Sequence, residues 1–462
     1  MNADGYIELK SPATGVAFGK VNYHCFEEAV YKLQLSKKVQ KEWKTTSLTE
    51  RIQLVQSAMQ YFSENREAIA RDITSQMGKP ITQSRNEIKG MLHRAEVCCQ
   101  LAEDALKDID ITQTGKLVQW IRREPLGVVL NIAAWNYPLL IAVNVVVPAL
   151  LAGNAVAIKH SSLTPLSAAA FEDAFNQAGS PKGLVTTLAL THATTERIIN
   201  SPHIDHVAFT GSVGGGRKIQ SAIQNHFIGS GFELGGKDPA YIREDADIAA
   251  VSPNVMDGVF YNGGQSCCAV ERIYVHHSLY TEFCNGAIEF MNNLKIGDPM
   301  EEETDLGPMA QLSGVKTVQS QLEDAMAQGA KINSYSGSIP NGEHFIKPTI
   351  CTQVTHDMIL MTEETFGPIV GIMPVESDEE AVRLMNDSPF GLTASIWTKD
   401  KEKAIEIGSQ IEAGTVYMNR CDYLDPHLPW VGVKDSGSGC TLSALGIQVL
   451  TRPKSYHFKK DV

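Results

Sequence analysis

The sequence predicts an α/β protein built on doubly wound parallel sheets and divided into two or three domains. Its 462 residues are too many for one ordinary hydrophobic core. Between residues 115 and 240, short apolar runs alternate with stretches long enough to be crossover helices, which is typical of a parallel sheet. A second alternating region, from about 258 to 430, predicts another α/β unit.

The first part of the chain, from about residue 24 to residue 110, is expected to be helical. Ser47 and Glu50 match the capping box that begins many helices. Apolar residues then recur at helical spacing: Ile52, Val55, Ala58, Met59 and Phe62. Gly78 and Pro80 are expected to end the helical run that follows. Amphipathic helices facing a core account for this whole segment.

Four apolar runs predict the strands of the first sheet: 127–135, 154–160, 183–190 and 206–211. The most apolar stretch, 138–153, is broken by Asn144 and Pro148 and is shorter than the roughly 20 residues that a membrane-spanning helix needs, so we expect a buried core helix. In the second unit, candidate strands lie near 271–276, 368–375 and 393–398. The final segment, 451–462, is expected to be an extended tail or an edge strand.

Composition and charge exclude several classes of protein. The formal net charge of −13 argues against nucleic acid as a partner, because such a partner calls for a basic face. The N-terminus lacks the basic start and apolar run of a secretory signal. The nine cysteines include no C-x-x-C pair, which argues against a disulfide framework and against a zinc site. We expect a cytoplasmic protein that uses no metal and binds no membrane.

Polar and small residues gather where the predicted strands of the first sheet end, which is where such sheets bind ligands. They are Asn136, Lys159, Ser161, Ser162, Thr210, Gly211 and Ser212. The usual G-x-G-x-x-G fingerprint is missing after the first strand, and so is the acidic residue expected about 20 positions later. The glycine-rich segment 209–219 suits a backbone cradle for phosphate, but a tight strand-to-helix turn would use the same residues. Both interpretations stay open.

Two further segments carry residues able to do chemistry. Glu233 lies in an otherwise apolar predicted strand, where burial would raise its pKa and suit it to act as a base. Taken alone, it is better explained as a carboxylate paired with a basic residue. Cys267 and Cys268 follow a glycine pair, which gives the close backbone access that a nucleophile needs. Most unpaired cysteines are nevertheless small buried hydrophobes, so this run alone also favours a structural role.

The order of the motifs favours a catalytic role for these residues over a structural one. AWNYP, FTGSxxxG, ELGGK, NxGQxC, EETFGP and GVKDSGSG occur in sequence at large, defined spacings. The set resembles the NAD(P)-dependent aldehyde dehydrogenase superfamily over nearly the whole chain, and the spacing from Glu233 to Cys267 is similar to that between the family's base and nucleophile.

The resemblance implies an aldehyde dehydrogenase-like α/β fold with two doubly wound parallel-sheet domains and a small β oligomerisation arm. We expect a dinucleotide-binding domain from 1–106 and 126–235, and a catalytic domain from 236–435. The segments 107–125 and 436–462 would form the arm and the C-terminal segment. Family members are dimers or tetramers, so a homodimer or homotetramer is expected.

The resemblance also assigns catalytic roles. The family's nucleophile is the second residue after the glutamine of G-Q-x-C, which is Cys267, so Cys268 is a bystander. The side-chain amide of Asn136 and the backbone N–H of Cys267 would stabilise the oxyanion, and one such donor is worth ~3 kcal/mol. Glu233 would activate the water that releases the acid from a Cys267 thioester.

The resemblance also identifies cofactor-binding residues, and it implies NAD or NADP as the cofactor. Lys159 matches the lysine that reaches the adenosine ribose, and Glu364 and Phe366 match the residues at the nicotinamide end. The turn and helix start near the pyrophosphate are matched by Gly211, Ser212 and Gly216. Ser162 stands where the NAD-preferring pattern has a glutamate. Because a serine does not repel a 2′-phosphate, use of both cofactors is expected.

The resemblance implies a small-molecule aldehyde as the substrate. Short succinate-semialdehyde dehydrogenases carry an arginine nine residues after the tryptophan of the first motif, and this chain has Asn144 there. An amide cannot make arginine's bidentate pair with a carboxylate. The neighbouring Leu139, Leu140 and Val143 suggest an apolar channel, so we expect a neutral aliphatic or aromatic aldehyde, with succinate semialdehyde as the alternative.

Two other functions were weighed. A CoA-acylating relative typically lacks the glutamate found here as Glu233. A non-catalytic structural relative would have no need of the four residues retained together: Cys267, Glu233, Asn136 and Lys159.

Overall fold

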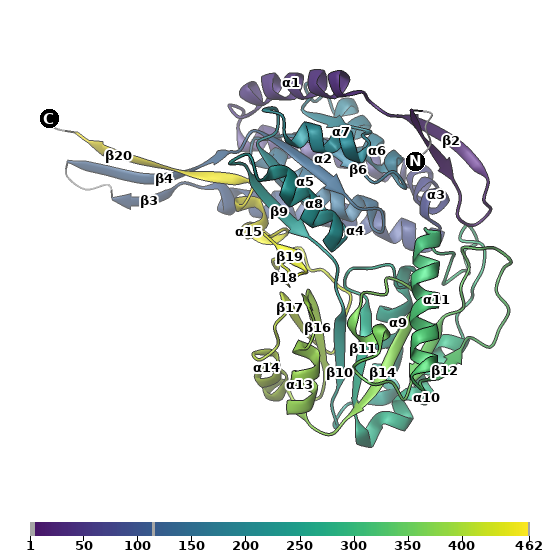
Figure 1. Cartoon of the computed structure of the whole chain (residues 1–462). Coiled ribbons are helices and arrows are strands. Elements are labelled where there is room, and N and C mark those ends of the chain that lie inside the picture. Colours follow the sequence, from purple (N-terminus) through teal and green to yellow (C-terminus); the bar gives the residue numbers. More distant parts are fainter. Residues whose placement is uncertain (1–4, 113–115, 461–462) are drawn as a thin grey trace.

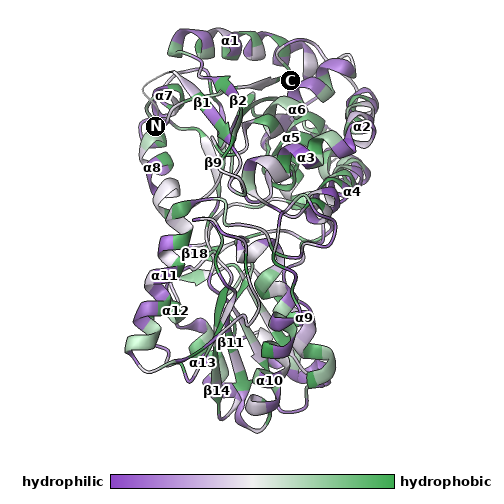
Figure 2. Cartoon of the chain, turned by 90° about the vertical axis from the view of Figure 1, so that its right-hand side faces the viewer, coloured by the Kyte–Doolittle hydropathy of each residue, from purple (hydrophilic) through white to green (hydrophobic). Residues whose placement is uncertain are grey.

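The computed structural model describes residues 5–112 and 116–460. Two α/β units lie one above the other, and a narrow three-stranded arm extends from the upper one (Figure 1). The strands of both sheets are largely hydrophobic, while the outer helices carry mixed polar and apolar faces (Figure 2). Within the described residues, no helix has the length and apolar character needed to cross a membrane.

The first unit is built on a six-stranded sheet of order β19-β9-β8-β5-β6-β7, parallel except for β19. Its strands are β5 Val128–Ala133, β6 Ala155–His160, β7 Val185–Thr187, β8 His206–Thr210, β9 Gly229–Glu233 and β19 Gly437–Ser438. Both faces of the sheet are covered by helices: α1 Phe26–Trp43, α5 Pro138–Leu151, α6 Pro165–Gln177, α7 His192–Ile199 and α8 Val213–Ile223. The four predicted strands are confirmed, and β5 and β6 are buried at every residue, as expected for central parallel strands.

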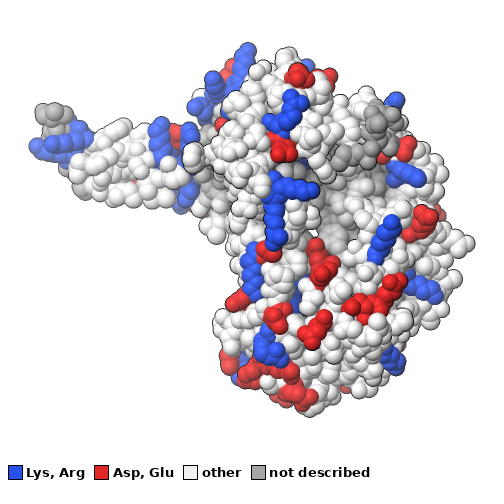
Figure 3. All heavy atoms as spheres, in the orientation of Figure 1, with Lys and Arg blue, Asp and Glu red and all other residues white. Residues whose placement is uncertain are grey.

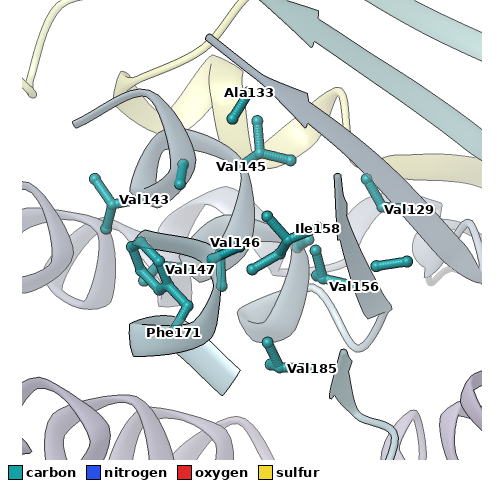
Figure 4. Close-up of a cluster of buried hydrophobic side chains, with 14 of the residues drawn as sticks. Val129, Ala133, Val143, Val145, Val146, Val147, Val156, Ile158, Phe171 and Val185 are labelled. Carbon is teal, nitrogen blue, oxygen red and sulfur yellow. The ribbon is translucent and has the colours of Figure 1, made fainter. Parts of the chain in front are cut away.

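The apolar stretch after β5 is confirmed as a buried helix, α5. Its valines Val143, Val146 and Val147 belong to the same core as the strand residues Val156 and Ile158 (Figure 4). Complete burial of such a side chain stabilises the fold by roughly 1.5–3 kcal/mol.

Three helices flank this core: α2 Leu48–Glu64, α3 Arg66–Met77 and α4 Ile81–Leu106. The predicted capping box is present, because Ser47 Oγ accepts the Glu50 N–H at 3.2 Å and Glu50 Oε2 accepts the Ser47 N–H at 2.7 Å. Gly78 ends α3 in the left-handed conformation, at φ +80°. Before α1 lies a hairpin that the sequence did not predict, β1 Tyr6–Lys10 with β2 Ala17–Asn22. Almost all of β2 is exposed, so it lacks the apolar alternation that marks a strand.

The second unit has a seven-stranded sheet of order β12-β13-β14-β11-β10-β16-β17, parallel except for β12. Its strands are β10 Asp238–Ile242, β11 Val270–His276, β12 Lys331–Ser334, β13 Thr349–Thr352, β14 Ile369–Val375, β16 Thr393–Trp397 and β17 Thr415–Met418. The three candidate strands are confirmed as β11, β14 and β16. The sheet also takes in β10, which precedes the predicted alternating region.

Helices cover both faces of this second sheet, and separate hydrophobic cores lie on the two sides. One face carries α9 Ile248–Phe260 and α10 Tyr280–Asn292. The other carries α11 Leu312–Ala327, α12 Ile359–Thr362, α13 Asp378–Asn386 and α14 Lys401–Gly408. A short pair, β15 Phe390–Gly391 with β18 Val433–Lys434, leads the chain back to the first unit.

The arm consists of β3 Ile109–Thr112, β4 Leu117–Pro125 and β20 Thr451–Lys459. Strand β20 pairs antiparallel with the whole of β4, so the C-terminal segment is an edge strand. The rings of Trp120 and Tyr456 stack across the pair with centroids 4.4 Å apart. Before β20, helix α15 Ser443–Gln448 packs on the first unit rather than on the arm. The expected domain ranges include residues 1–4, 113–115 and 461–462, which lie outside the described residues.

Candidate active site

The two units meet where the first sheet passes into the second. Glu233 ends β9, and after the short segment 234–237 the chain enters β10 of the other sheet. On the face shown in Figure 3 the surface is hollowed between the units. A side chain at the end of β9 therefore lies at the junction.

The glycine pair after Glu233 permits two close approaches. A methyl group on Gly236 would stand 2.2 Å from the carbonyl oxygen of Cys267, and one on Gly235 would stand 2.5 Å from the carboxylate of Glu364. The contact at Gly236 leaves no room for a side chain because the obstacle is backbone, whereas a side chain at Gly235 would require the Glu364 carboxylate to move. The ELGGK motif thus brings the strand end against both the cysteine loop and Glu364.

The loop that carries Cys267 is a left-handed turn tied to the first unit. It begins with a 3₁₀ segment, Tyr261–Gly264, in which Asn262, Gly263 and Gly264 have φ of 54°, 64° and 69°. The Asn262 side-chain amide donates to the carbonyl of Asn136 at 3.2 Å, and its backbone N–H donates to the Gln83 side chain at 3.0 Å. The turn thereby places the cysteine loop beside the end of β5.

The two adjacent cysteines differ in exposure and partners. Cys267 is half-buried, while Cys268 is buried and its thiol donates to Asp422 Oδ1 at 3.0 Å. Ser266 donates to the same oxygen at 3.1 Å. The contact with Cys267, followed by burial, raises the pKa of the Cys268 thiol well above its usual value. Cys268 is thus a protonated, occupied group, and the accessible thiol is that of Cys267. All nine cysteines are free.

The Glu233 carboxylate is held by two hydroxyl groups. Thr210, at the end of β8, donates to Oε2 at 3.0 Å, and Thr441 donates to Oε1. Burial raises the pKa of Glu233, and the two hydrogen bonds and the positive charge of Arg94 partly oppose this shift. No basic residue forms an ion pair with Glu233 within the described part of the chain. A carboxylate in this setting suits a base that works near neutral pH.

Asn136 lies between β5 and α5, with its side chain buried. In the described part of the chain, neither atom of its side-chain amide has a hydrogen-bond partner. The turn around it is fixed instead through the backbone, because Glu87 accepts the N–H of Leu139 at 2.8 Å and His160 Nε2 contacts the carbonyl of Pro138 at 3.1 Å. The amide is therefore positioned and free to donate to an oxyanion.

The expected cofactor residues lie in three segments of the chain. Lys159 and Ser162 lie at the end of β6, apart from Glu233 and Cys267. Lys159 is only 8% exposed, has no described partner, and burial lowers its pKa to about 8. Ser162 is exposed.

The glycine-rich turn opens α8. Ser212 Oγ accepts the N–H of Gly215 at 3.2 Å and caps the helix. A methyl group on Gly211 would meet the Phe209 ring at 2.8 Å, and one on Gly216 would meet Leu234 at 2.7 Å. A methyl group at either glycine would force a neighbouring side chain to move, so packing favours glycine at both positions, and both interpretations of the turn stay open.

The EETFGP segment places the remaining two cofactor residues, Glu364 and Phe366, at the junction. Glu364 accepts the N–H of Gly236 at 3.0 Å, and burial, with repulsion from Glu271, raises its pKa to about 7. Phe366 adopts φ +50° and contacts the edge of Trp135, with ring centroids 5.6 Å apart. Its N–H donates to Glu271 at 2.8 Å.

These residues fit a dinucleotide. The ammonium of Lys159, which has no partner among the described residues, lies at one end of the carboxyl edge of the first sheet. The capped N-terminus of α8 lies along this edge. Glu364 and Phe366 lie at its other end. The chemistry matches two nucleosides joined by a diphosphate. Within residues 5–112 and 116–460, no group of His, Cys, Asp or Glu side chains is arranged to hold a metal ion.

Three side chains near the site were missed by the sequence analysis. Thr441 and Asp422 come from irregular segments of the second half of the chain and carry no local signal. Arg94 comes from α4, which the periodicity explained as a core-facing helix. Its Nη1 donates to the Asn144 side chain at 3.1 Å. Of the three residues expected to line an apolar channel, Val143 lines a pocket next to Asn144, whereas Leu139 is buried in the core.

Comparison with known proteins agrees with this arrangement. The profile of the Aldehyde dehydrogenase family matches residues 1–456. An aldehyde dehydrogenase of Paenarthrobacter nicotinovorans is 35% identical over 451 residues, covering 96% of this chain and 98% of the relative. A succinate-semialdehyde dehydrogenase of Mycobacterium avium, whose name specifies NADP(+), is 33% identical over 415 residues, covering 89% and 88%. The structure of an NAD-dependent aldehyde dehydrogenase from Sinorhizobium meliloti matches with a TM-score of 0.95 at 28% identity, covering 98% and 92%.

The close approach of Gly236 to the Cys267 carbonyl can be tested by substitution. Gly236→Ala should remove most activity, because the new methyl group must displace the carbonyl of Cys267 and with it the thiol. Gly231→Ala, in the same strand run, meets nothing within 4 Å and serves as the matched control. Steady-state turnover and the alkylation rate of Cys267 measure the effect, with a thermal melt to check folding. Equal turnover in the two variants would show that the contact does not position the loop.

Proposed function

Because this chain belongs to the aldehyde dehydrogenase family and is an NAD(P)-dependent enzyme, we propose that it oxidises an aldehyde to the carboxylic acid through a covalent intermediate on Cys267. One observation carries the proposal. The glycine pair after Glu233 lies against the carbonyl of Cys267, so a carboxylate with a raised pKa and the accessible thiol share one junction.

In the first step the Cys267 thiolate attacks the aldehyde carbon and forms a thiohemiacetal oxyanion. The free amide of Asn136 and the backbone N–H of Cys267 donate hydrogen bonds to that oxygen. Each donor contributes ~3 kcal/mol when it is positioned in advance, and the Asn262 hydrogen bond to the Asn136 carbonyl supplies that positioning.

When bound, the dinucleotide supplies the oxidant that takes up hydride from the carbon attached to Cys267, which leaves a thioester. Lys159 would bind the adenosine end, and Gly211, Ser212 and Gly216 would form the turn at the diphosphate. Glu364 and Phe366 would hold the nicotinamide end. In these terms the first unit is the dinucleotide-binding domain and the second is the catalytic domain.

Glu233 then takes a proton from water, and the hydroxide releases the acid from Cys267. The hydroxyl groups of Thr210 and Thr441 keep the carboxylate in place for this step. A base held in this way favours hydrolysis over transfer of the acyl group to CoA.

The arm supports a further part of the proposal, which is a homodimer or homotetramer. Strands β3, β4 and β20 extend away from the body and carry exposed apolar side chains such as Ile109, Ile111 and Phe458. Such side chains are expected to pack against a second copy. Light scattering of the purified protein tests this, and a monomeric mass would contradict it.

The assignment of the nucleophile is tested with a matched pair. Cys267→Ala should abolish NAD(P)H formation, because the variant lacks the proposed nucleophile. Cys268→Ala should keep most of it, with a stability loss of about 1–3 kcal/mol because the Asp422 carboxyl loses a donor. Absorbance of NAD(P)H reports turnover, and equal loss in both variants would refute the assignment.

Replacing the base should separate the two chemical steps. Glu233→Gln should accumulate acyl-enzyme, visible in the intact mass after one turnover, and slow the steady state by about 100-fold or more. In the unmodified enzyme, acyl-enzyme hydrolysis should slow as the pH falls below the raised pKa of Glu233, because the protonated carboxyl cannot accept a proton. That acid limb should be absent from the variant. Undiminished turnover of Glu233→Gln would count against the role.

The cofactor preference can be tested at Ser162. Burial, aided by the charges of Lys159 and Lys218, lowers the pKa of His192, so basic side chains gather near the end of β6 and favour a 2′-phosphate. Ser162→Glu should weaken NADPH binding by about tenfold or more through like-charge repulsion, and should spare NADH. Ser162→Gln is the neutral control of similar size. Fluorescence titration of the bound dinucleotide measures both, and an unchanged NADPH affinity in Ser162→Glu would show that this position does not face the phosphate.

A further inference from the structure

Arg94 is a cation without a counter-ion beside the active site. Its side chain, on α4, donates from Nη1 to the carbonyl of Leu140 at 3.3 Å and to Asn144 Oδ1 at 3.1 Å. Among the described residues it forms no ion pair, and its Nε and Nη2 have no hydrogen-bond partner. Two nitrogens of the Arg94 guanidinium therefore have no acceptor among the described residues.

Arg94 is half-buried, and its state differs from that of most buried cations in the described part of the chain. Lys79 pairs with Glu87, and Lys237 pairs with Glu271 at 2.8 Å. Arg272 donates to three carbonyl groups. Leaving a desolvated charge unpaired is costly, so a fold normally satisfies it. Lys159 is buried and has no partner among the described residues, and its proposed role is to bind an anionic cofactor.

The Arg94 side chain lines a pocket. Arg94 and Asn144 line it together with apolar walls that include Leu101, Val143 and Ile447. Asn144 is only 5% exposed, and its Nδ2 has no partner in the described residues. Its Oδ1 orients the guanidinium, so the amide and Arg94 present donors side by side.

The pocket lies close to the reacting groups. Leu442 lines it and also packs, with Cys267, against the apolar cluster around Cys268. Burial lowers the pKa of Arg94, and the charges of Glu233 and of the two cysteines partly oppose this, so these groups lie within electrostatic range. Arginine nevertheless stays protonated.

We infer that the guanidinium of Arg94, oriented by Asn144, binds the carboxylate at the far end of a short aldehyde acid, so that the preferred substrates are ω-carboxylated aldehydes. The inference rests on the proposed function and names its substrate class. It replaces the neutral aldehyde expected from Asn144, because the positive charge missing at that position is supplied by a different helix. A neutral aldehyde would leave Arg94 unpaired, whereas a carboxylate completes its fork.

The test compares succinate semialdehyde with butanal, which has the same chain length and no carboxylate. The unmodified full-length enzyme should show the higher kcat/KM for succinate semialdehyde. Arg94→Met should raise the KM for succinate semialdehyde by about 10- to 100-fold, because a charged hydrogen-bonded contact is lost, and should leave the KM for butanal unchanged. Arg420→Met is the matched control, since Arg420 lines a neighbouring pocket and stacks over Tyr423.

A binding measurement separates recognition from catalysis. Succinate, which cannot react, should raise the melting temperature of the unmodified enzyme and of Arg420→Met but not of Arg94→Met. Equal loss of activity towards both aldehydes in Arg94→Met would overturn the inference in favour of an effect on Glu233 or Cys267. A loss confined to Arg420→Met, or a preference for butanal in the unmodified enzyme, would also overturn it. If no aldehyde is oxidised at all, the proposed function itself fails.

Discussion

The backbone contact between Gly236 and the carbonyl of Cys267 is the constraint on which the site depends. It joins the end of a strand in one sheet to a loop in the other with no room for a methyl group. On the opposite side of that loop, the Asn262 amide ties the turn to the carbonyl of Asn136. Glu233, Cys267 and Asn136 are therefore held by short contacts to the backbone, which fix geometry more tightly than flexible side chains would. The same contacts hold the two units together.

Features encoded within a few residues were predictable from the sequence. The capping box at Ser47 and Glu50 is local, and the strands β5 and β6 are apolar along their whole length because helices cover both faces. The β1–β2 hairpin was missed because β2 is almost entirely exposed and has no apolar alternation. Position in a motif selected Cys267 over Cys268, and the structure gives that choice a physical basis, since the thiol of Cys268 is already occupied by Asp422.

Contacts between distant segments were not predictable from local patterns. Thr441 lies 208 positions from the Glu233 carboxylate that it binds, and Arg94 lies 50 positions from Asn144. The sequence shows an uncharged amide at position 144 and, from that, no anchor for a carboxylate. The fold brings a guanidinium from α4 to that amide, so the charge of a pocket is a property of the assembled helices and not of one aligned position.

The cations in and around the site differ in whether the protein itself supplies a counter-ion. Lys79 and Lys237 are neutralised by carboxylates within the protein, and their role is complete in the folded chain. Lys159 is buried and Arg94 half-buried, neither has a counter-ion among the described residues, and they lie on different elements, β6 and α4. An unpaired cation costs stability that an anionic ligand returns on binding. In the proposed function the first anion is the cofactor and the second is the far end of the substrate. The Cys267 thiol then acts on an aldehyde whose charged end is already held.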